Sequence, residues 1–299
     1  MSSESCVEVE SVPEALHPER AGSAVACPAD RVAPSRATDS DPRRRFNVCV
    51  LGRFQVLKDH APIRFARRAQ RKPLELLQAL IAFGGTEVGA HVLTDALWPD
   101  SEGDAGYHAL ESALYRLRQL LGSRSVVTVV AGKLTLDRQQ VWVDLWELQQ
   151  ELRVGPGVRA EEWVARLRLL YQGQFLEQDS ERPWAVKTRQ ALHDRLVRAI
   201  RDAAHTCGER CLWDEASRLY QAGIDVDSLA EDLHRGLIIC HRELGNHAEA
   251  LQAYRRCREL LAKMLGVVPN TKTLAAYQSA RQRAAMTPGA MARLYAGAD

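Results

Sequence analysis

Four side chains that form hydrogen bonds recur at helical spacing in the middle of the chain: His108, Glu111, Ser112 and Tyr115. At 100° per residue they share one face of a helix predicted over 104–121, and a stripe of leucines occupies the opposite face. Donors and acceptors on an exposed helix face can read base edges in the major groove of DNA. The chemistry that this spacing predicts is therefore base recognition by hydrogen bonds.

Basic side chains before and after these positions could contact DNA phosphates. The candidates are Arg67, Arg68, Arg71, Lys72, Arg116, Arg118, Arg124 and Lys133. Phosphate contacts supply much of the affinity of DNA-binding proteins. Each of these residues could equally be a solvated surface charge, and Arg118 could form an ion pair inside its domain. The net charge of the whole chain is only +2, which does not by itself argue for nucleic acid.

The elements around these residues follow the order of a winged helix. Short β-rich runs begin at Phe46 and continue to about residue 65, and a helical pattern then takes over. Three helices are predicted, over 71–83, 90–97 and 104–121, and strand-like pieces follow over 126–130, 134–136 and 141–143, with a turn at Gly132-Lys133. In winged-helix proteins the third helix enters the major groove. We therefore expect the helix over 104–121 to be the recognition helix.

Two segments carry a more specific resemblance. They are HVLTDALWPD (91–100) and HALESALYRLRQLLG (108–122), and together they resemble the DNA-binding domain of the antibiotic regulatory protein (SARP) family. That domain is an OmpR-type winged helix. The opening FNVCVLGRFQV (46–56) resembles the start of the same domain. The resemblance implies a sequence-specific transcriptional activator that binds promoter repeats as a dimer and contacts RNA polymerase.

The proposed reading face departs from the family in its charge. Family members commonly have Asn at the position of His108, and an amide or a basic residue at that of Glu111. A carboxylate in the groove is repelled by phosphates unless it accepts a hydrogen bond from a cytosine amino group. Asp100, Glu102 and Asp104 add negative charge just before the helix. These residues favour an alternative, in which the winged helix no longer binds DNA.

The second half of the chain contains a 34-residue echo. The segments CLWDEASRLYQAGIDVD (211–227) and GNHAEALQAYRRCRELL (245–261) align Ala216 with Ala250 and Tyr220 with Tyr254. This spacing is the period of tetratricopeptide-type (TPR) helical hairpins, which stack and leave a concave surface for a partner. The predicted helices are 144–152, 159–171, 183–207, 212–223, 228–244, 246–264 and 271–285.

This half resembles the bacterial transcriptional activation domain that follows the winged helix in SARP regulators. The runs RPWAVKTRQALHDRL (182–196) and LGNHAEALQAYRRCRELLAKMLGVVPN (244–270) carry the resemblance. We interpret Trp163, Trp184 and Trp213 as packing anchors. The run Arg255, Arg256 and Arg258 is either a solvated face or a contact surface for an acidic partner or the DNA backbone. An unknown small ligand could also bind in the helical domain.

Residues 1–45 hold five of the 12 prolines and no apolar period, and they are predicted to be a disordered leader. We divide the rest into a winged-helix domain over 46–143, a helical domain over 144–285 and a flexible tail over 286–299. There is no secretory signal or membrane-spanning run, and the seven cysteines form no disulfide framework, so a cytoplasmic protein is expected.

Cofactor chemistry is not indicated by the sequence. His205, Cys207 and Cys211 lie within seven residues, but Gly208 is expected to break the helix between them, so we interpret them as packing residues and predict no metal site. No phosphate-binding loop or nucleophile elbow is present, and no enzyme activity is predicted. The prediction is a transcriptional regulator with an α+β winged helix followed by an all-α TPR-like domain; the alternative is a protein- or ligand-binding module.

Overall fold

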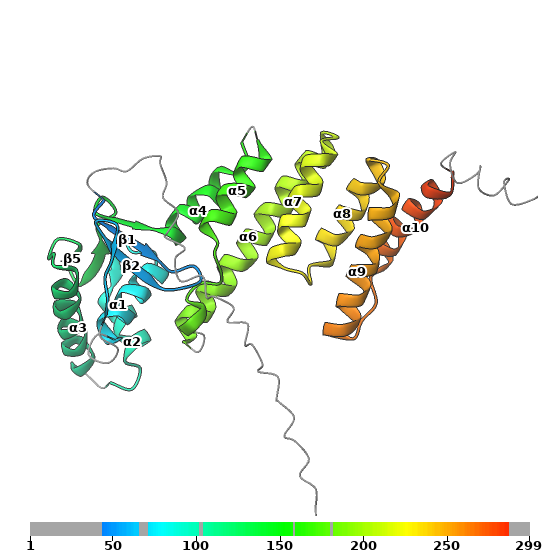
Figure 1. Ribbon diagram of the computed structural model, residues 1–299. Helices are drawn as coiled ribbons and strands as arrows, with labels where there is room; N and C mark the ends of the chain where they lie inside the picture. Colours follow the sequence, from blue (N-terminus) through cyan, green and yellow to red (C-terminus); the bar gives the residue numbers. More distant parts are fainter. Residues whose placement is uncertain (1–43, 66–70, 102–103, 158, 180–181, 287–299) are drawn as a thin grey trace, which may run out of the picture. The chain divides into compact units, whose positions relative to one another are not determined.

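The computed structural model describes residues 44–65, 71–101, 104–157, 159–179 and 182–286. The predicted leader, apart from its last two residues, and the predicted tail after Met286 lie outside these ranges. The first half of the described chain forms short strands and helices, and the second half is helical (Figure 1).

The first sheet contains strands from both ends of the winged-helix half. Its order is β3 (Ala61–Pro62), β2 (Gln55–Lys58), β1 (Phe46–Cys49) and β7 (Val141–Val143). β1 pairs antiparallel with β2 but parallel with β7, with Phe46 opposite Val141. The sequence placed 141–143 among the strands around the wing turn. The structure instead returns this strand to the first sheet, about 95 positions away along the chain.

Three helices pack against one another: α1 (Arg71–Ala82), α2 (Ala90–Leu97) and α3 (Ala105–Leu121). A second sheet follows, in the order β4 (Val88–Gly89), β6 (Lys133–Leu136) and β5 (Val127–Val130). The predicted helices are present with ends shifted by one residue at most. β4 was not predicted, because a strand of two residues is too short to show an alternation of apolar and polar side chains. This arrangement is a winged helix, with β5 and β6 as the wing.

The rest of the described chain is helical. The helices are α4 (Asp144–Val154), α5 (Ala160–Leu170), α6 (Pro183–Glu209), α7 (Trp213–Val226), α8 (Glu231–Glu243), α9 (His247–Leu265) and α10 (Thr271–Met286), with a short 3₁₀ turn η1 (Glu177–Asp179). Each predicted helix is present. One local expectation was wrong: α6 continues through Gly208, and the chain turns at Cys211, whose φ is 59°.

The 34-residue echo falls on α7 and α9, the second helices of successive hairpins. Ala216 and Ala250 are both fully buried. Tyr220 packs on Gly236 of α8, where a Cβ atom would lie 2.3 Å from the tyrosine ring, and Tyr254 stacks on Tyr277 of α10 with ring centroids 4.1 Å apart. Small residues and aromatic rings therefore interlock between the hairpins. The predicted fold class, a winged helix followed by a TPR-like helical domain, is confirmed.

A buried carboxylate joins the two halves. Asp144, the first residue of α4, accepts hydrogen bonds from the backbone N–H groups of Val50 and Leu51, both at 2.9–3.0 Å, and from that of Leu145 at 2.7 Å. Burial raises the pKa of this carboxyl group to about 7, and the backbone N–H groups oppose the increase. Leu51 also forms a β-bridge with Phe175. The loop after β1 is therefore fixed to the helical half.

Candidate nucleic-acid interface

The recognition helix α3 has one buried face and one exposed face. Leu110, Leu117 and Leu121 are between 0 and 4% exposed. The helix ends at Gly122, which has a φ of 64° and donates its N–H to the carbonyls of Arg118 and Gln119. Lys58 of β2 donates to the last carbonyl of the helix at 3.4 Å. These contacts fix the position of α3 against the winged-helix core.

The four residues predicted to read bases all lie on the exposed face of α3. His108, Glu111, Ser112 and Tyr115 are exposed, and Tyr115 is 60% accessible. His108 Nδ1 lies 3.8 Å from a carboxylate oxygen of Glu111. The structure therefore brings these four side chains together on a surface that a duplex could reach. Their contacts with bases stay a prediction.

Two of the predicted phosphate contacts are well placed next to this face. Arg116 of α3 and Arg124, just beyond its end, are exposed, and neither forms an ion pair or hydrogen bond with another described residue. Their guanidinium groups are therefore available to an external anion. Arg118 differs, because its Nε and Nη2 donate to the carbonyl of Val127 at 3.1 and 2.7 Å. Arg118 holds α3 to strand β5 of the wing.

The wing carries little free charge. Its turn is formed by Ala131 and Gly132, both with positive φ, a conformation that suits a tight hairpin. Lys133 follows the turn, and its ammonium lies 3.2 Å from a carboxylate oxygen of Glu87. The two side chains directly before the turn are exposed and apolar, with Val129 45% and Val130 72% accessible. The sequence did not single out these valines.

Arg71 and Lys72 lie at the start of α1, where they surround a buried carboxylate that sequence reasoning missed. Arg71 Nε and Lys72 Nζ are 2.9 and 3.1 Å from the two oxygens of Glu75, which is 8% exposed. Arg182, just before α6, lies 2.9 Å from the same carboxylate. Arg67 and Arg68 lie outside the described residues. The sequence contained a sign of this pairing, because Glu75 follows Arg71 by four positions on a predicted helix, and side chains at this spacing lie next to each other.

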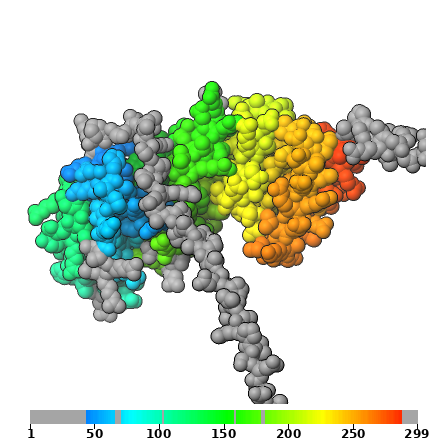
Figure 2. Space-filling model, in the orientation of Figure 1, coloured from blue at the N-terminus to red at the C-terminus, as the bar shows by residue number. Residues whose placement is uncertain are grey.

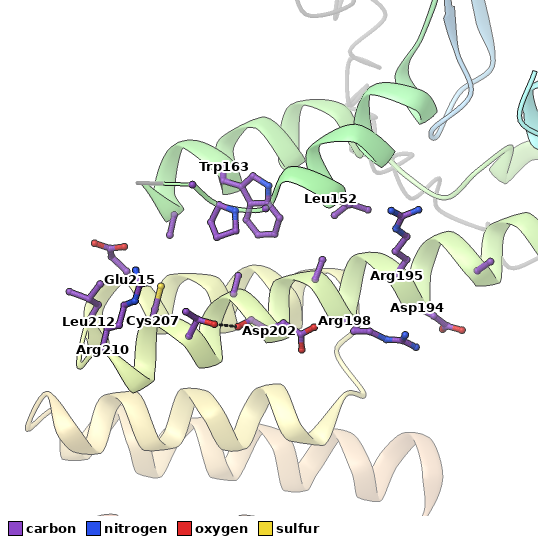
Figure 3. A pocket seen from close by; sticks show the side chains of 18 residues that line it. Leu152, Trp163, Asp194, Arg195, Arg198, Asp202, Cys207, Arg210, Leu212 and Glu215 are labelled. Atoms are coloured by element: carbon purple, nitrogen blue, oxygen red, sulfur yellow. Dashed lines mark hydrogen bonds between the residues drawn. The ribbon is translucent and has the colours of Figure 1, made fainter.

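The helical half contains a cleft of about 840 Å³ between the α4–α5 hairpin and α6. Figure 3 shows Trp163 and Leu152 on the hairpin side, and Arg195 rising from α6 toward them. Cys207 and Glu215 lie at the other end of the cleft. Trp163 is fully buried and donates its indole N–H to the carbonyl of Glu151 at 3.1 Å, so it forms a fixed wall.

The described ranges contain neither a cluster of metal ligands nor a membrane-spanning helix. No group of three or more His, Cys, Asp or Glu side chains there could hold a metal ion. Within the same ranges no helix is long and apolar enough to cross a membrane. Figure 2 shows α9 in orange at the surface of the molecule. Arg255, Arg256 and Arg258 of this helix are exposed.

Comparison with known proteins supports the class that the fold defines. Residues 143–281 match the family model for the bacterial transcriptional activator domain, so the chain contains this domain directly after its winged helix. This is the domain arrangement of a SARP-type transcriptional regulator, and the recognition made from the sequence is confirmed.

Two individual proteins are similar to the chain. Regulatory protein AfsR of Streptomyces coelicolor is 27% identical over 257 residues, which is 83% of this chain and 25% of AfsR. The chain therefore spans about a quarter of the length of this relative. A structure of Mycobacterium tuberculosis EmbR, in complex with a low-affinity phosphopeptide, matches with a TM-score of 0.58 and 20% identity over 84% of this chain and 71% of that one. At this identity the likeness shows the fold alone.

Proposed function

We propose that the protein is a sequence-specific DNA-binding transcriptional activator. α3 docks in the major groove of promoter DNA, and the wing turn at 131–134 lies near the minor groove or the backbone. The observation that carries this proposal is the face of α3 opposite its leucines, where four polar side chains are exposed. His108, Glu111, Ser112 and Tyr115 read bases, and Arg116 and Arg124 contact phosphates.

The helical domain completes the proposed mechanism. Its stacked hairpins support a homodimer on repeated promoter sites and contact RNA polymerase. In this proposal, residues 46–143 form the DNA-binding domain, and residues 144–285 form the domain that contacts the second subunit and RNA polymerase. The match of 143–281 to the bacterial transcriptional activator domain and the likeness to AfsR, which is named a regulatory protein, support this assignment.

A salt titration with random duplex DNA tests the DNA-binding step. We expect the affinity of the full chain to fall steeply with salt, because bound phosphates release counterions. Arg116→Ala should weaken binding at every sequence and reduce the salt slope by about 1, as expected for one lost phosphate contact. Arg281→Ala, at an exposed position on α10, is the matched control and should bind like the wild type.

Two results would count against this function. Absence of detectable binding at low salt would exclude DNA as the partner. Unchanged affinity in Arg116→Ala would remove that residue from the proposed surface.

A second candidate function is a ligand-binding module whose winged helix does not bind DNA. The cleft between the α4–α5 hairpin and α6 favours it, because its volume of about 840 Å³ lies in the range of small-molecule sites. Ala203 of α6 lines this cleft and is 6% exposed. Saturable binding of the dye 1-anilinonaphthalene-8-sulfonate that is lost in Ala203→Trp would support this candidate. Equal dye binding by the wild type and this variant would count against it.

A further inference from the structure

The end of α9, the loop after it and the start of α10 expose a group of large apolar side chains. Met264 and Leu265 end the helix, and Val267 and Val268 follow in the loop; these four are between 48 and 80% accessible. Leu274, near the start of α10, is 37% accessible. We call these five residues the apolar tip. α9 has 19 residues and α8 has 13, and Figure 1 shows the end of α9 extending past the neighbouring end of α8. Exposed apolar patches rimmed by polar residues mark interaction sites.

The backbone of the loop is fixed at both of its ends. Gly266 has a φ of 69°, which suits the left-handed end of a helix, and its N–H donates to the carbonyl of Ala262 at 3.1 Å. The N–H of Asn270 donates to the carboxylate of Glu231 at 2.8 Å. The side-chain oxygen of Asn270 accepts from the N–H of Thr273 at 3.0 Å and so caps α10. A partner would therefore find the two valines of the loop already held in place.

Positive charge surrounds the apolar tip. Residues 255–274 contain five cations and one carboxylate, Glu259, so their net charge is +4, whereas that of the whole chain is +2. The carboxylate of Glu231, which meets the loop from α8, reduces the local charge to +3. All five cations are exposed, and none forms an ion pair or hydrogen bond with another described residue. They are Arg255, Arg256, Arg258, Lys263 and Lys272.

Part of this charge lies along the same edge of the hairpin as the apolar tip. Tyr254 of α9 stacks on Tyr277 of α10, and the short loop between the helices makes them antiparallel. Arg258 follows Tyr254 by four positions and Leu274 precedes Tyr277 by three, so each lies one turn from its tyrosine on the same helix face, toward the loop. Leu265 follows Arg258 by seven positions, or two turns, on that face. Basic and apolar side chains therefore share the outer edge of the α9–α10 hairpin.

This combination of side chains favours a protein as the occupant. A DNA backbone offers phosphates and sugars, and it would leave most of the apolar tip uncovered. A second copy of the chain would bring the same positive charge to a two-fold interface, where like charges repel. A helix that lies on a membrane needs a free apolar face along its length. The apolar face of α9 is instead buried in the helical domain, through Ala250, Ala253, Cys257 and Leu261.

We propose that the end of the α9–α10 hairpin binds an acidic amphipathic helix of a partner protein. The apolar face of that helix covers Met264, Leu265 and Val268, and its carboxylates meet Arg255 and Arg258. The proposal deepens the partner-binding role proposed for the helical domain and rests on it. It does not depend on base recognition by α3.

Fluorescence anisotropy with a labelled peptide and the full chain tests this surface. The probe is a designed helix of about 18 residues, or five turns, with leucines on one face and glutamates on the other. We expect saturable binding. A peptide of the same composition, with its leucines spread around the helix, should bind about tenfold more weakly, because it has the charge without the apolar face. Absence of saturable binding of the probe would overturn the proposal, and so would equal affinity for the two peptides.

Substitutions in the hairpin locate the binding surface. Met264→Gln keeps the length and helix propensity of the side chain but removes its apolar character, so it should weaken probe binding about tenfold. Arg258→Gln should weaken it about threefold, as expected for one exposed ion pair. Leu169→Gln on α5 and Arg53→Gln after β1 replace exposed side chains elsewhere and should bind within about twofold of the wild type. Wild-type affinity in Met264→Gln would overturn the proposal.

Three further measurements separate this proposal from the proposed function and from other occupants. Met264→Gln should bind duplex DNA like the wild type, so a loss of probe binding alone is specific to the hairpin. Absence of DNA binding by the wild type would count against the activator and leave the peptide result intact. In sedimentation velocity, a wild-type dimer that Met264→Gln dissociates would assign the apolar tip to a second copy. Phosphatidylserine vesicles that bind the wild type but not Met264→Gln would assign it to a membrane. Either of these last two results would overturn the proposal.

Discussion

At the residue scale, few of the basic side chains on α3 and the wing are available to DNA phosphates. On α3, Arg116 is exposed and forms no ion pair or hydrogen bond with another described residue, whereas Arg118 bonds to the wing. On the wing, Lys133 lies beside Glu87. Among the described residues near α3, Arg116 and Arg124 are therefore the predicted phosphate contacts whose guanidinium groups are available to DNA.

Glu111 gives a sharp prediction about base preference. A carboxylate accepts from the amino group of cytosine, whereas glutamine pairs with both donor and acceptor of adenine. Selection of binding sites from random duplexes with Glu111→Gln should change the preference at one base pair from cytosine toward adenine. Non-specific affinity should also rise severalfold at low salt, and less at high salt, because a repulsive charge is removed.

The control for this prediction is Glu249→Gln, an exposed carboxylate of α9 that lies outside the reading face. It should leave the selected sites unchanged. An unaltered preference in Glu111→Gln would show that this side chain does not reach a base.

At the scale of elements, the sequence was most informative where contacts are local. The leucine spacing in α3 and the small and aromatic residues of the 34-residue echo placed helices to within a few residues. It was least informative for contacts between distant positions. Asp144 bonds to Val50, 94 positions away, and Arg182 meets Glu75 at a separation of 107. The spacing of residues within one segment gives no information about such distant pairs. Arg71 and Lys72 were therefore interpreted as phosphate contacts or solvated charges, without their partner Glu75.

The buried carboxyl group of Asp144 should make the stability of the protein depend on pH. Burial raises the pKa of this carboxyl group to about 7 in the folded state, from about 3.8 in the unfolded chain. The folded state therefore binds the proton more tightly, and its stabilisation is fully present below pH 3.8 and is lost as the pH rises through about 7. The slope in that interval is at most about 1.4 kcal/mol per pH unit.

Urea unfolding of the full chain at several pH values would measure this effect. Asp144→Asn should remove this part of the pH dependence, whereas Asp95→Asn, at an exposed position on α2, should retain it. An identical pH profile in wild type and Asp144→Asn would contradict the assignment to Asp144.

The hairpin contacts predict an unusually costly glycine substitution. A Cβ atom at Gly236 of α8 would lie 2.3 Å from the ring of Tyr220, so Gly236→Ala must displace that ring. Overpacking of this kind costs about 1–3 kcal/mol. Gly208→Ala is the matched control, because its nearest contact, with Trp213, would be an ordinary 3.4 Å and alanine favours a helix. Chemical denaturation should show a loss for the first variant only; equal stability of the two would contradict this packing.

At the scale of the whole molecule, the buried residues form two clusters of different size. One cluster runs from Phe46 to Cys240 and includes side chains of both the winged helix and the first helical hairpins. The second is confined to α8, α9 and α10. In stacked repeats, each unit is stabilised chiefly by its neighbours. The molecule should therefore open from the α10 end while the larger cluster stays folded.

Hydrogen exchange with Tyr277→Ala tests this order of stability. Tyr277 stacks on Tyr254 at 4.1 Å, and an aromatic pair contributes about 0.5–1.5 kcal/mol beyond its buried area. The variant should lose amide protection in α9 and α10, because these helices depend on the small cluster. Protection of α1, α3 and α6 should stay at the wild-type level, because the large cluster does not contain Tyr277. A uniform loss of protection along the chain would instead show that the two clusters unfold as one cooperative unit.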